Sequence, residues 1–364
     1  MPQPTWRAEW PLLAGAVSAV SVLVHFDPAG PLWTGWLLCC IVACSARAMA
    51  HADLLAERFG EPAGTIILTV AAIIIEVAAV CAMMLGSAGN PAVARDSMFA
   101  VIMIILNGLV GGSMLIGSWR RPEVTFNADS ALAYLPVLIT LASITLVLPR
   151  FTQSAAGGWM SNGMEVFVGG GSLALYGSFL WLQSSRYRGY FAVGHPAAAV
   201  PASHVGHVSV PRAITLLVIA LALVVVCAEG MAGRLGRLLT RLHLPPEFGG
   251  VFIAVMVLTP EGFAALRASA RGDMQRSINV LLGSAVATIG LTVPAVLAVR
   301  WITGVDPEFG LEPPYIVLLG VTFFVSAMNL MRGRVNAMQG LIHLLILFGW
   351  LVTILDESLP PEAP

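Results

Sequence analysis

Residues 67–84 read ILTVAAIIIEVAAVCAMM, and residues 250–266 read GVFIAVMVLTPEGFAAL. Each of these apolar runs contains one glutamate, Glu76 in the first and Glu261 in the second. A charged side chain at the centre of a bilayer costs about 2.5–3.5 kcal/mol on insertion scales. The alternative is a structural carboxylate that forms hydrogen bonds to neighbouring helices. This alternative could explain a single such residue, but it explains less well why two similar segments each contain one. The pair therefore predicts a site for a cation or a proton.

The two runs belong to a weak internal repeat, which is visible in the spacing of residues rather than in their identity. The matched spacings are twelve residues from Gly64 to Glu76 and from Gly249 to Glu261, and eleven residues from Asp96 to Asn107 and from Asp273 to Ser284. Asn107 and Ser284 thus occupy equivalent positions, where their side chains could donate neutral oxygens to an ion. They could equally be the small or polar packing residues that are common between membrane helices.

Composition predicts an all-α membrane protein. The chain is 57% hydrophobic and 11% charged, and segments long enough to span a bilayer recur along it. We count eleven, near 10–26, 31–49, 63–86, 97–118, 129–148, 163–184, 212–232, 248–268, 277–299, 312–331 and 337–355. The first has no cleavage-site pattern, and we interpret it as a retained helix. The expected organisation is an extra helix (1–30), a first five-helix repeat (31–184), a cytoplasmic linker (185–211) and a second five-helix repeat (212–364).

The arginines predict the orientation in the membrane. All 19 basic residues are arginine, and thirteen of them lie in the N-terminal tail and the alternate loops on its side. An excess of positive charge marks the cytoplasmic side, so we expect a cytoplasmic N-terminus, an outside C-terminus and location in the cell inner membrane. The formal net charge of −1 argues against a nucleic-acid partner. The lipid bilayer and the transported ions are the expected partners, and the chain could also form a homo-oligomer.

Topology gives the repeat a meaning. The copies begin five spans apart, so they enter the membrane from opposite sides. Inverted repeats of this kind place a substrate site near the bilayer midplane, between the halves. The sequence contains no phosphate-binding loop, dinucleotide motif or HExxH zinc motif. We therefore predict a transporter that runs on an ion gradient, without a cofactor, and not an enzyme.

The motifs resemble the calcium/proton antiporter family of the cation/Ca²⁺ exchanger superfamily, and most closely its bacterial ChaA-type sodium/potassium/calcium–proton antiporters. The resemblance covers nearly the whole chain after the first span. It rests on ADLLAERFGEPAGTIILTVAAIIIE (52–76), CAEGMAGRLGRLL (227–239), LTPEGFAAL (258–266) and INVLLGSAVATIGLTVP (278–294). It implies that Glu76 and Glu261 bind the cation or the proton, and that Asp53 and Glu229 are acids for gating or proton relay. Both of the latter could instead be ordinary solvated acids near the membrane ends.

Departures from the family motif concern selectivity. Ala72-Ile73 and Val257-Leu258 stand where the broader family has Gly-Asn before each glutamate. Ala287 and Gly111 stand where it has polar amides. Ca²⁺ takes six to eight oxygen ligands, so we expect Na⁺ or K⁺ to be carried beside Ca²⁺.

Two carboxylates at one site provide a minimal exchange mechanism, because they can hold two protons or one divalent cation but not both. Pro260 should break the helix beside Glu261, and the freed carbonyls could line the site. His343, in the last span, is expected to be a hydrogen-bonded structural residue. His195, His204 and His207 fall in the linker, which we interpret as a flexible segment rich in Ala, Pro and Val. A pH or metal sensor is the alternative for these histidines. A cation channel is the main alternative function, and an intramembrane hydrolase with a glutamate base is a weaker one.

Overall fold

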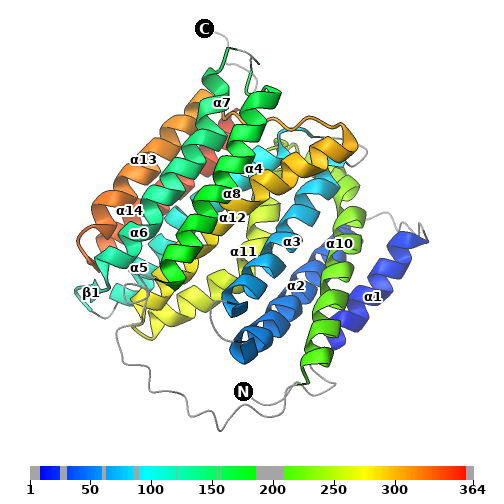
Figure 1. Cartoon of the computed structure of the whole chain (residues 1–364), viewed down its shortest axis with the longest axis horizontal. Coiled ribbons are helices and arrows are strands. Elements are labelled where there is room, and N and C mark those ends of the chain that lie inside the picture. Colours follow the sequence, from blue (N-terminus) through cyan, green and yellow to red (C-terminus); the bar gives the residue numbers. More distant parts are fainter. Residues whose placement is uncertain are drawn as a thin grey trace. The chain divides into compact units, whose positions relative to one another are not determined.

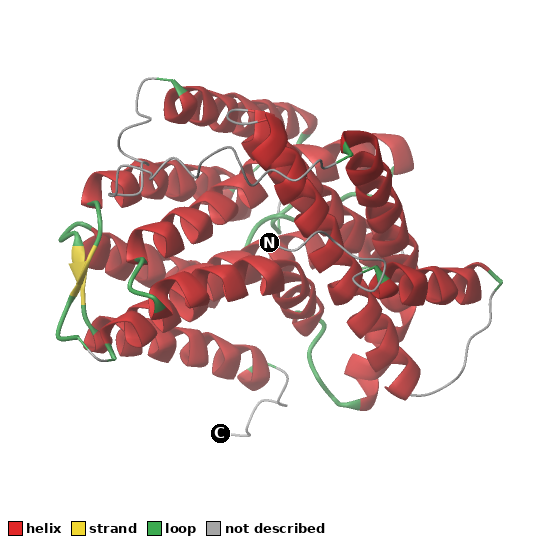
Figure 2. Ribbon diagram, turned by 90° about the horizontal axis from the view of Figure 1, so that it is seen from below, coloured by secondary structure: helices red, strands yellow, loops and turns green. Residues whose placement is uncertain are grey.

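The computed structural model describes residues 9–24, 31–59, 63–85, 90–119, 121–153, 155, 157–185 and 209–357. Nearly all of this is helix, with one short pair of strands (Figure 2). The all-α prediction is therefore confirmed. The linker histidines His195, His204 and His207 lie outside the described residues. The chain forms two compact units, Met1–Asn90 with His195–Arg241, and Pro91–Gly194 with Leu242–Pro364. Each unit takes segments from both predicted repeats.

The first unit is a bundle of four helices: α1 (Trp10–Leu23), α2 (Pro31–Phe59), α3 (Ala63–Leu85) and α10 (Val210–Arg241) (Figure 1). Helix α10 packs along both α2 and α3, and α1 packs against α2 and α10. Small residues allow this close packing, because a Cβ atom on Gly230 would lie 2.4 Å from a methyl group of Val22. An ion pair of 2.6 Å between Arg47 and Glu9 also joins α2 to the residue before α1.

The second unit contains the remaining elements (Figure 1). Its helices are α4 (Val93–Met103), the π-helix η2 (Ile104–Val110), α5 (Gly111–Ser118), α6 (Ala128–Ala142), the π-helix η3 (Ser143–Val147), α7 (Leu148–Phe151), α8 (Asn162–Ser184), α11 (Phe248–Ala270), α12 (Met274–Thr303), α13 (Pro313–Leu330) and α14 (Ala337–Asp356). The strands β1 (Val124–Thr125) and β2 (Arg334–Val335) pair antiparallel, with Val124 opposite Val335.

Several helices of the second unit begin at a side-chain cap. A cap accepts a backbone N–H that would otherwise have no partner in the first turn. Asn127 caps α6, Asp273 caps α12, and Asn336 caps α14 in a capping box with Gln339. Helix α12 ends at Gly304, whose φ of 75° suits glycine. The polar residues between the apolar runs therefore fix where these helices begin and end.

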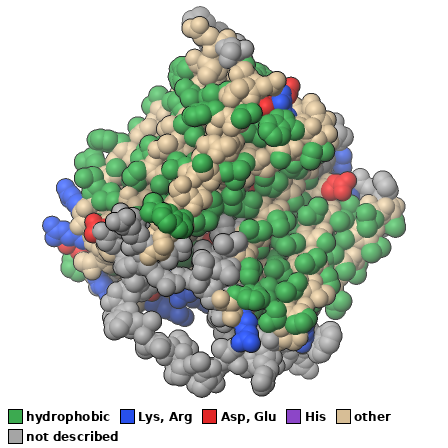
Figure 3. Space-filling model, in the orientation of Figure 1, with side chains coloured by type: hydrophobic (Ala, Val, Ile, Leu, Met, Phe, Trp, Pro, Cys, Tyr) green, Lys and Arg blue, Asp and Glu red, His purple; other side chains and the backbone are tan. Residues whose placement is uncertain are grey.

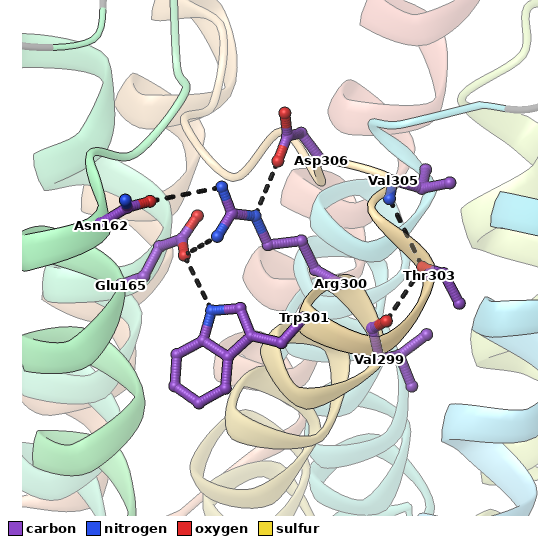
Figure 4. A network of polar contacts seen from close by, with 8 residues as sticks. All are labelled: Asn162, Glu165, Val299, Arg300, Trp301, Thr303, Val305 and Asp306. Atoms are coloured by element: carbon purple, nitrogen blue, oxygen red, sulfur yellow. Dashed lines mark hydrogen bonds and ion pairs between the residues drawn. The ribbon is translucent and has the colours of Figure 1, made fainter.

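Loops that the sequence places on one side of the membrane meet at one end of the second unit. Arg95 pairs with Glu308 at 2.6 Å, and Arg150 pairs with Glu312 at 2.7 Å. Figure 4 shows Arg300 at the end of α12, with Glu165 of α8 and Asp306 as its partners. At the other end, β1 pairs with β2, and the side chain of Gln275 accepts from the backbone N–H of Asn127. In this unit the ion pairs of Arg95, Arg150 and Arg300 thus lie at one end and the strand pair at the other, and the assignment of loops to the two sides of a membrane stays a prediction.

Eight helices in the described part of the chain are long and apolar enough to cross a membrane, or nine if the bent helix α11 is one span. Helix α1 and the stretch Val70–Leu85 of α3 are apolar but shorter. The described residues of the predicted segments are helical except at a few segment ends, but the total of eleven spans is not confirmed. Hydrophobic side chains cover most of the face seen in Figure 3, where charged side chains are few.

Candidate functional site

Glu261 follows directly after a bend in α11. The two parts of this helix, Phe248–Thr259 and Glu261–Ala270, lie at 57° to each other. A proline has no backbone N–H to donate, and its ring clashes with the preceding turn, so a bend at Pro260 is the expected result. The bend lies where the sequence predicts a helix break, and the role of Pro260 stays a prediction. Glu261 is partly exposed and directly follows the point where the helix bends.

Ser284 is the first partner of this carboxylate. Its hydroxyl group, on α12, donates a hydrogen bond of 3.3 Å to Oε2 of Glu261. Ser284 is also partly exposed. The structure therefore brings together two of the predicted site residues, an acidic oxygen and a neutral one, on adjacent helices that pack against each other.

Asn107 lies in the π-helix η2 and is fully buried. Single π-helical turns inside α-helices occur frequently at functional sites. The amide nitrogen of Asn107 donates to Oγ1 of Thr322 on α13 at 2.9 Å. The amide oxygen of Asn107, Oδ1, lies 3.0 Å from Nδ1 of His343 on α14. The expectation that His343 is a hydrogen-bonded residue is confirmed.

The π-helix also contacts α11 beside the glutamate. A Cβ atom on Gly262 would lie 3.0 Å from a methyl carbon of Leu109. Leu109 is two residues from Asn107, and Gly262 directly follows Glu261. The three segments η2, α11 and α12 thus pack together in the second unit around Glu261 and Ser284.

Glu76 belongs to the first unit, where it lies in α3 and is only 1% exposed. Asp53 on α2 and Glu229 on α10 are exposed, as residues near membrane ends commonly are. Glu76 and Glu261 belong to different units, so the prediction that they face each other stays a prediction. What is established is a buried carboxylate in one unit and a partly exposed carboxylate at a helix bend in the other.

The ligands available to an ion are oxygens. Among the residues that the structure describes, no group of three or more His, Cys, Asp or Glu side chains could hold a metal ion. A carboxylate, a hydroxyl and an amide are the donor types at Glu261, Ser284 and Asn107. Oxygen donors suit hard cations such as Ca²⁺ and the alkali metals.

Sequence reasoning missed two features of this region, the π-helix and the bond between His343 and Asn107. A lone histidine in an apolar run does not indicate its partner. The two residues are 236 positions apart in the chain. Gly340, three residues before His343, is the one local signal, because a glycine on a membrane helix often marks a close approach of another helix.

Comparison with known proteins gives consistent matches over most of the chain. A family model described as sodium/calcium exchanger protein matches residues 30–185 and 212–355. An ionic transporter of Sinorhizobium fredii is 39% identical over 348 residues, which cover 94% of both chains. The sodium-potassium/proton antiporter ChaA of Escherichia coli is 33% identical over 322 residues, 86% of both chains. The solved structure of YfkE shares the fold, with a TM-score of 0.73, 15% identity, and coverage of 95% of this chain and 99% of the other.

Proposed function

The chain belongs to the sodium/calcium exchanger protein family, and from this premise we propose that it exchanges protons for Na⁺, K⁺ or Ca²⁺ through a site containing Glu76 and Glu261. At the coarser level it is a multi-pass membrane antiporter for cations, and not an enzyme. The resemblance to calcium/proton antiporters, and to the ChaA type among them, is likewise confirmed.

The observation that carries the proposal is the surroundings of Glu261. The carboxylate follows a helix bend of 57° and accepts a hydrogen bond from Ser284, while it remains partly exposed. A partly exposed carboxylate with a hydroxyl oxygen beside it is suited to bind a cation or a proton and to release it.

The exchange follows from competition for the same oxygens. A proton and a cation compete for the same carboxylate oxygens, because the protonated form carries no charge to attract the cation. A cation that enters the site stabilises the charged form and displaces the proton. In the proposed cycle, alternating access exposes the Glu76 and Glu261 carboxylates first to one side of the membrane and then to the other. Asp53 and Glu229, exposed on α2 and α10, would relay protons toward the membrane surface.

The proposed cargo includes monovalent cations. A relative that is 33% identical is named a sodium-potassium/proton antiporter, and the residues before each glutamate are apolar where the broader family carries Gly-Asn. Two ionised glutamates match the charge of Ca²⁺, and one ionised glutamate matches Na⁺ or K⁺. Ca²⁺ should therefore inhibit Na⁺ uptake by competing for the same site.

Transport in everted membrane vesicles tests the proposal. An imposed pH gradient would be combined with Na⁺, K⁺ or Ca²⁺ in turn, for the wild type, Glu76→Gln and Glu261→Gln. The amide keeps the size and polarity of the side chain but cannot release a proton, so exchange should fall by more than about a hundredfold. Glu123→Gln, at an exposed carboxylate (48% exposed), is the matched control and should exchange at the wild-type rate.

Two results would contradict the proposal. Wild-type exchange rates in either glutamate variant would remove the glutamates from the mechanism. Electrogenic cation flux without any coupled proton movement would support the alternative function, a cation channel.

A further inference from the structure

Arginines gather at the end of the second unit that carries the strand pair, on or beside three loops that contact one another. We call this group the arginine surface, and its exposed members are Arg121, Arg267, Arg271, Arg276, Arg332 and Arg334. The pairing of β1 with β2 joins two of the loops. The third loop, the turn between α11 and α12, contacts Arg121, because a Cβ atom on Gly272 would collide with Nη1 of Arg121. Figure 3 shows basic side chains along the edge where Figure 1 labels β1.

The arginine surface is largely without internal counter-charges. Among the residues that the structure describes, only Arg334 of this group forms an ion pair, at 3.4 Å to Glu123. The opposite end of the same unit differs, since Arg95, Arg150 and Arg300 each bond a carboxylate at 2.6–2.7 Å. The fold therefore neutralises the arginines at one end, and at the other end it leaves them available to an external anion.

The acidic residues near the arginine surface are too few to neutralise it. They are Glu123, Asp129 and Asp273. Asp273 is used as the cap of α12, where its carboxylate accepts from the backbone N–H of Arg276. Positive charges are thus in excess over negative ones on these loops, and an anionic ligand would be attracted to them.

Apolar side chains adjoin the arginines on the membrane side. Phe263, Arg267 and Arg271 follow each other at intervals of four residues on α11, so they share one face of the helix. All three are exposed, and so is Trp119, two residues before Arg121. An exposed apolar stripe that ends in arginines is the pattern of a helix leaving a bilayer, where tryptophan and arginine lie at the level of the lipid headgroups. This order favours a lipid over a soluble anion as the ligand.

We propose that the arginine surface binds the phosphate groups of anionic phospholipids in the leaflet at this end of the unit. Guanidinium groups bind phosphate oxygens through two parallel hydrogen bonds. Clusters of about four to eight basic residues beside membrane helices attract anionic lipids. The inference uses the location of the chain in a membrane, and it does not depend on the site containing Glu76 and Glu261. Bound lipid would fix the depth at which this end of the unit lies in the bilayer.

Lipid binding by the purified full-length chain tests the proposal. The protein in an uncharged detergent would be titrated with fluorescent phosphatidylglycerol or phosphatidylcholine, which have the same acyl chains but differ in headgroup charge. The wild type should bind phosphatidylglycerol about a hundredfold more tightly. Combining Arg121→Gln, Arg271→Gln and Arg276→Gln should remove most of this preference, because each arginine near an anionic surface strengthens binding about fivefold. Arg150→Gln, at the opposite end, is the matched control and should keep the wild-type preference.

Several results would overturn the proposal. They are equal binding of the two lipids by the wild type, and an unchanged preference in the triple variant. Inorganic phosphate that displaced the lipid at equal concentration would identify a site for free anions instead. A polyglutamate peptide that bound more tightly than phosphatidylglycerol would point to an acidic protein segment.

The salt dependence of the wild type provides a test that needs no variant to fold. The preference for phosphatidylglycerol should weaken strongly as salt is raised from about 0.05 M to about 1 M, because exposed charges are screened. A preference that did not change with salt would contradict the arginine–phosphate contacts. None of these measurements involves proton-coupled exchange, so failure of this inference would leave the proposed function intact.

Discussion

The helical segment 93–118 and helix α12 are aligned by the sequence repeat, yet they fold into different surroundings. The first is interrupted by the π-helix η2, and its central polar residue, Asn107, is fully buried and bonded to α13 and α14. Helix α12 is continuous from Met274 to Thr303, and its equivalent residue, Ser284, is partly exposed and bonded to Glu261. Equal positions in a repeat therefore need not have equal roles. Ser284 bonds the Glu261 carboxylate, whereas Asn107 bonds side chains of α13 and α14.

The largest expected difference is in the stability lost when an arginine is removed, Arg95 near the start of α4 or Arg300 near the end of α12. Arg95 is 7% exposed and bonds both Asp96 and Glu308, whereas Arg300 is 21% exposed. Arg95→Gln leaves the buried Asp96 without its cation, and removing one partner of a buried pair costs about 3–5 kcal/mol. Arg300→Gln should cost less, about 1–3 kcal/mol, because Arg300 itself is 21% exposed although its partner Glu165 is 4% exposed. Thermal unfolding of the purified variants measures both, and equal losses would show that the two ends are alike.

The next largest difference in stability is expected between alanine substitutions at two glycines, Gly111 and Gly283. A methyl group at Gly111 would lie 2.7 Å from Cβ of His343, while at Gly283 it would lie 3.6 Å from the Tyr134 ring. Gly111→Ala must separate α5 from α14, and overpacking of this kind costs about 1–3 kcal/mol. Gly283→Ala should be neutral or slightly stabilising. Unfolding of the two variants under the same conditions provides the test, and a neutral Gly111→Ala would contradict the close helix contact.

Transport should distinguish Asn107 from Ser284. Asn107→Leu removes an amide that is bonded on both sides, so the half-saturating cation concentration should rise about tenfold. Ser284→Ala removes a single bond of 3.3 Å to Glu261, and a rise of about two- to threefold is expected. Uptake by vesicles at matched expression levels checks the order. A larger effect of Ser284→Ala would reverse the assignment of the two roles.

The smallest effect on stability is expected from removing the side-chain cap at the start of α12. Asp273 accepts from the backbone N–H of Arg276 and caps α12, but α4 has no side-chain cap at Ala92. Asp273→Ala should cost about 1 kcal/mol, and Asp273→Asn should cost little because asparagine also caps. Unfolding of the two variants relative to the wild type measures the difference, and identical losses would point to charge rather than capping.

The sequence predicted those parts of the structure that depend on local chemistry. Apolar runs predicted the helices, Pro260 predicted the bend in α11, and the repeat spacing brought Ser284 into consideration beside Glu261. The π-helical hydrogen bonding of residues 104–110 could not be predicted, because nothing in the sequence IILNGLV distinguishes a π-helix from an α-helix. The partners of Asn107 come from α13 and α14, more than two hundred residues away. Contacts of that range depend on how the helices pack, and a single sequence contains little information about packing.

The strand pair β1–β2 has a consequence for the order of events during synthesis. Arg334 of β2 and Glu123, the residue before β1, are 211 residues apart. At about 5–20 residues per second, the second strand emerges about 10–40 s after the first. During that interval the backbone groups of Val124 and Thr125 have no strand partner, while the intervening helices are inserted into the membrane. A chain that terminates before Arg334 would leave this edge open, so the strand pair can close only after synthesis has passed Val335.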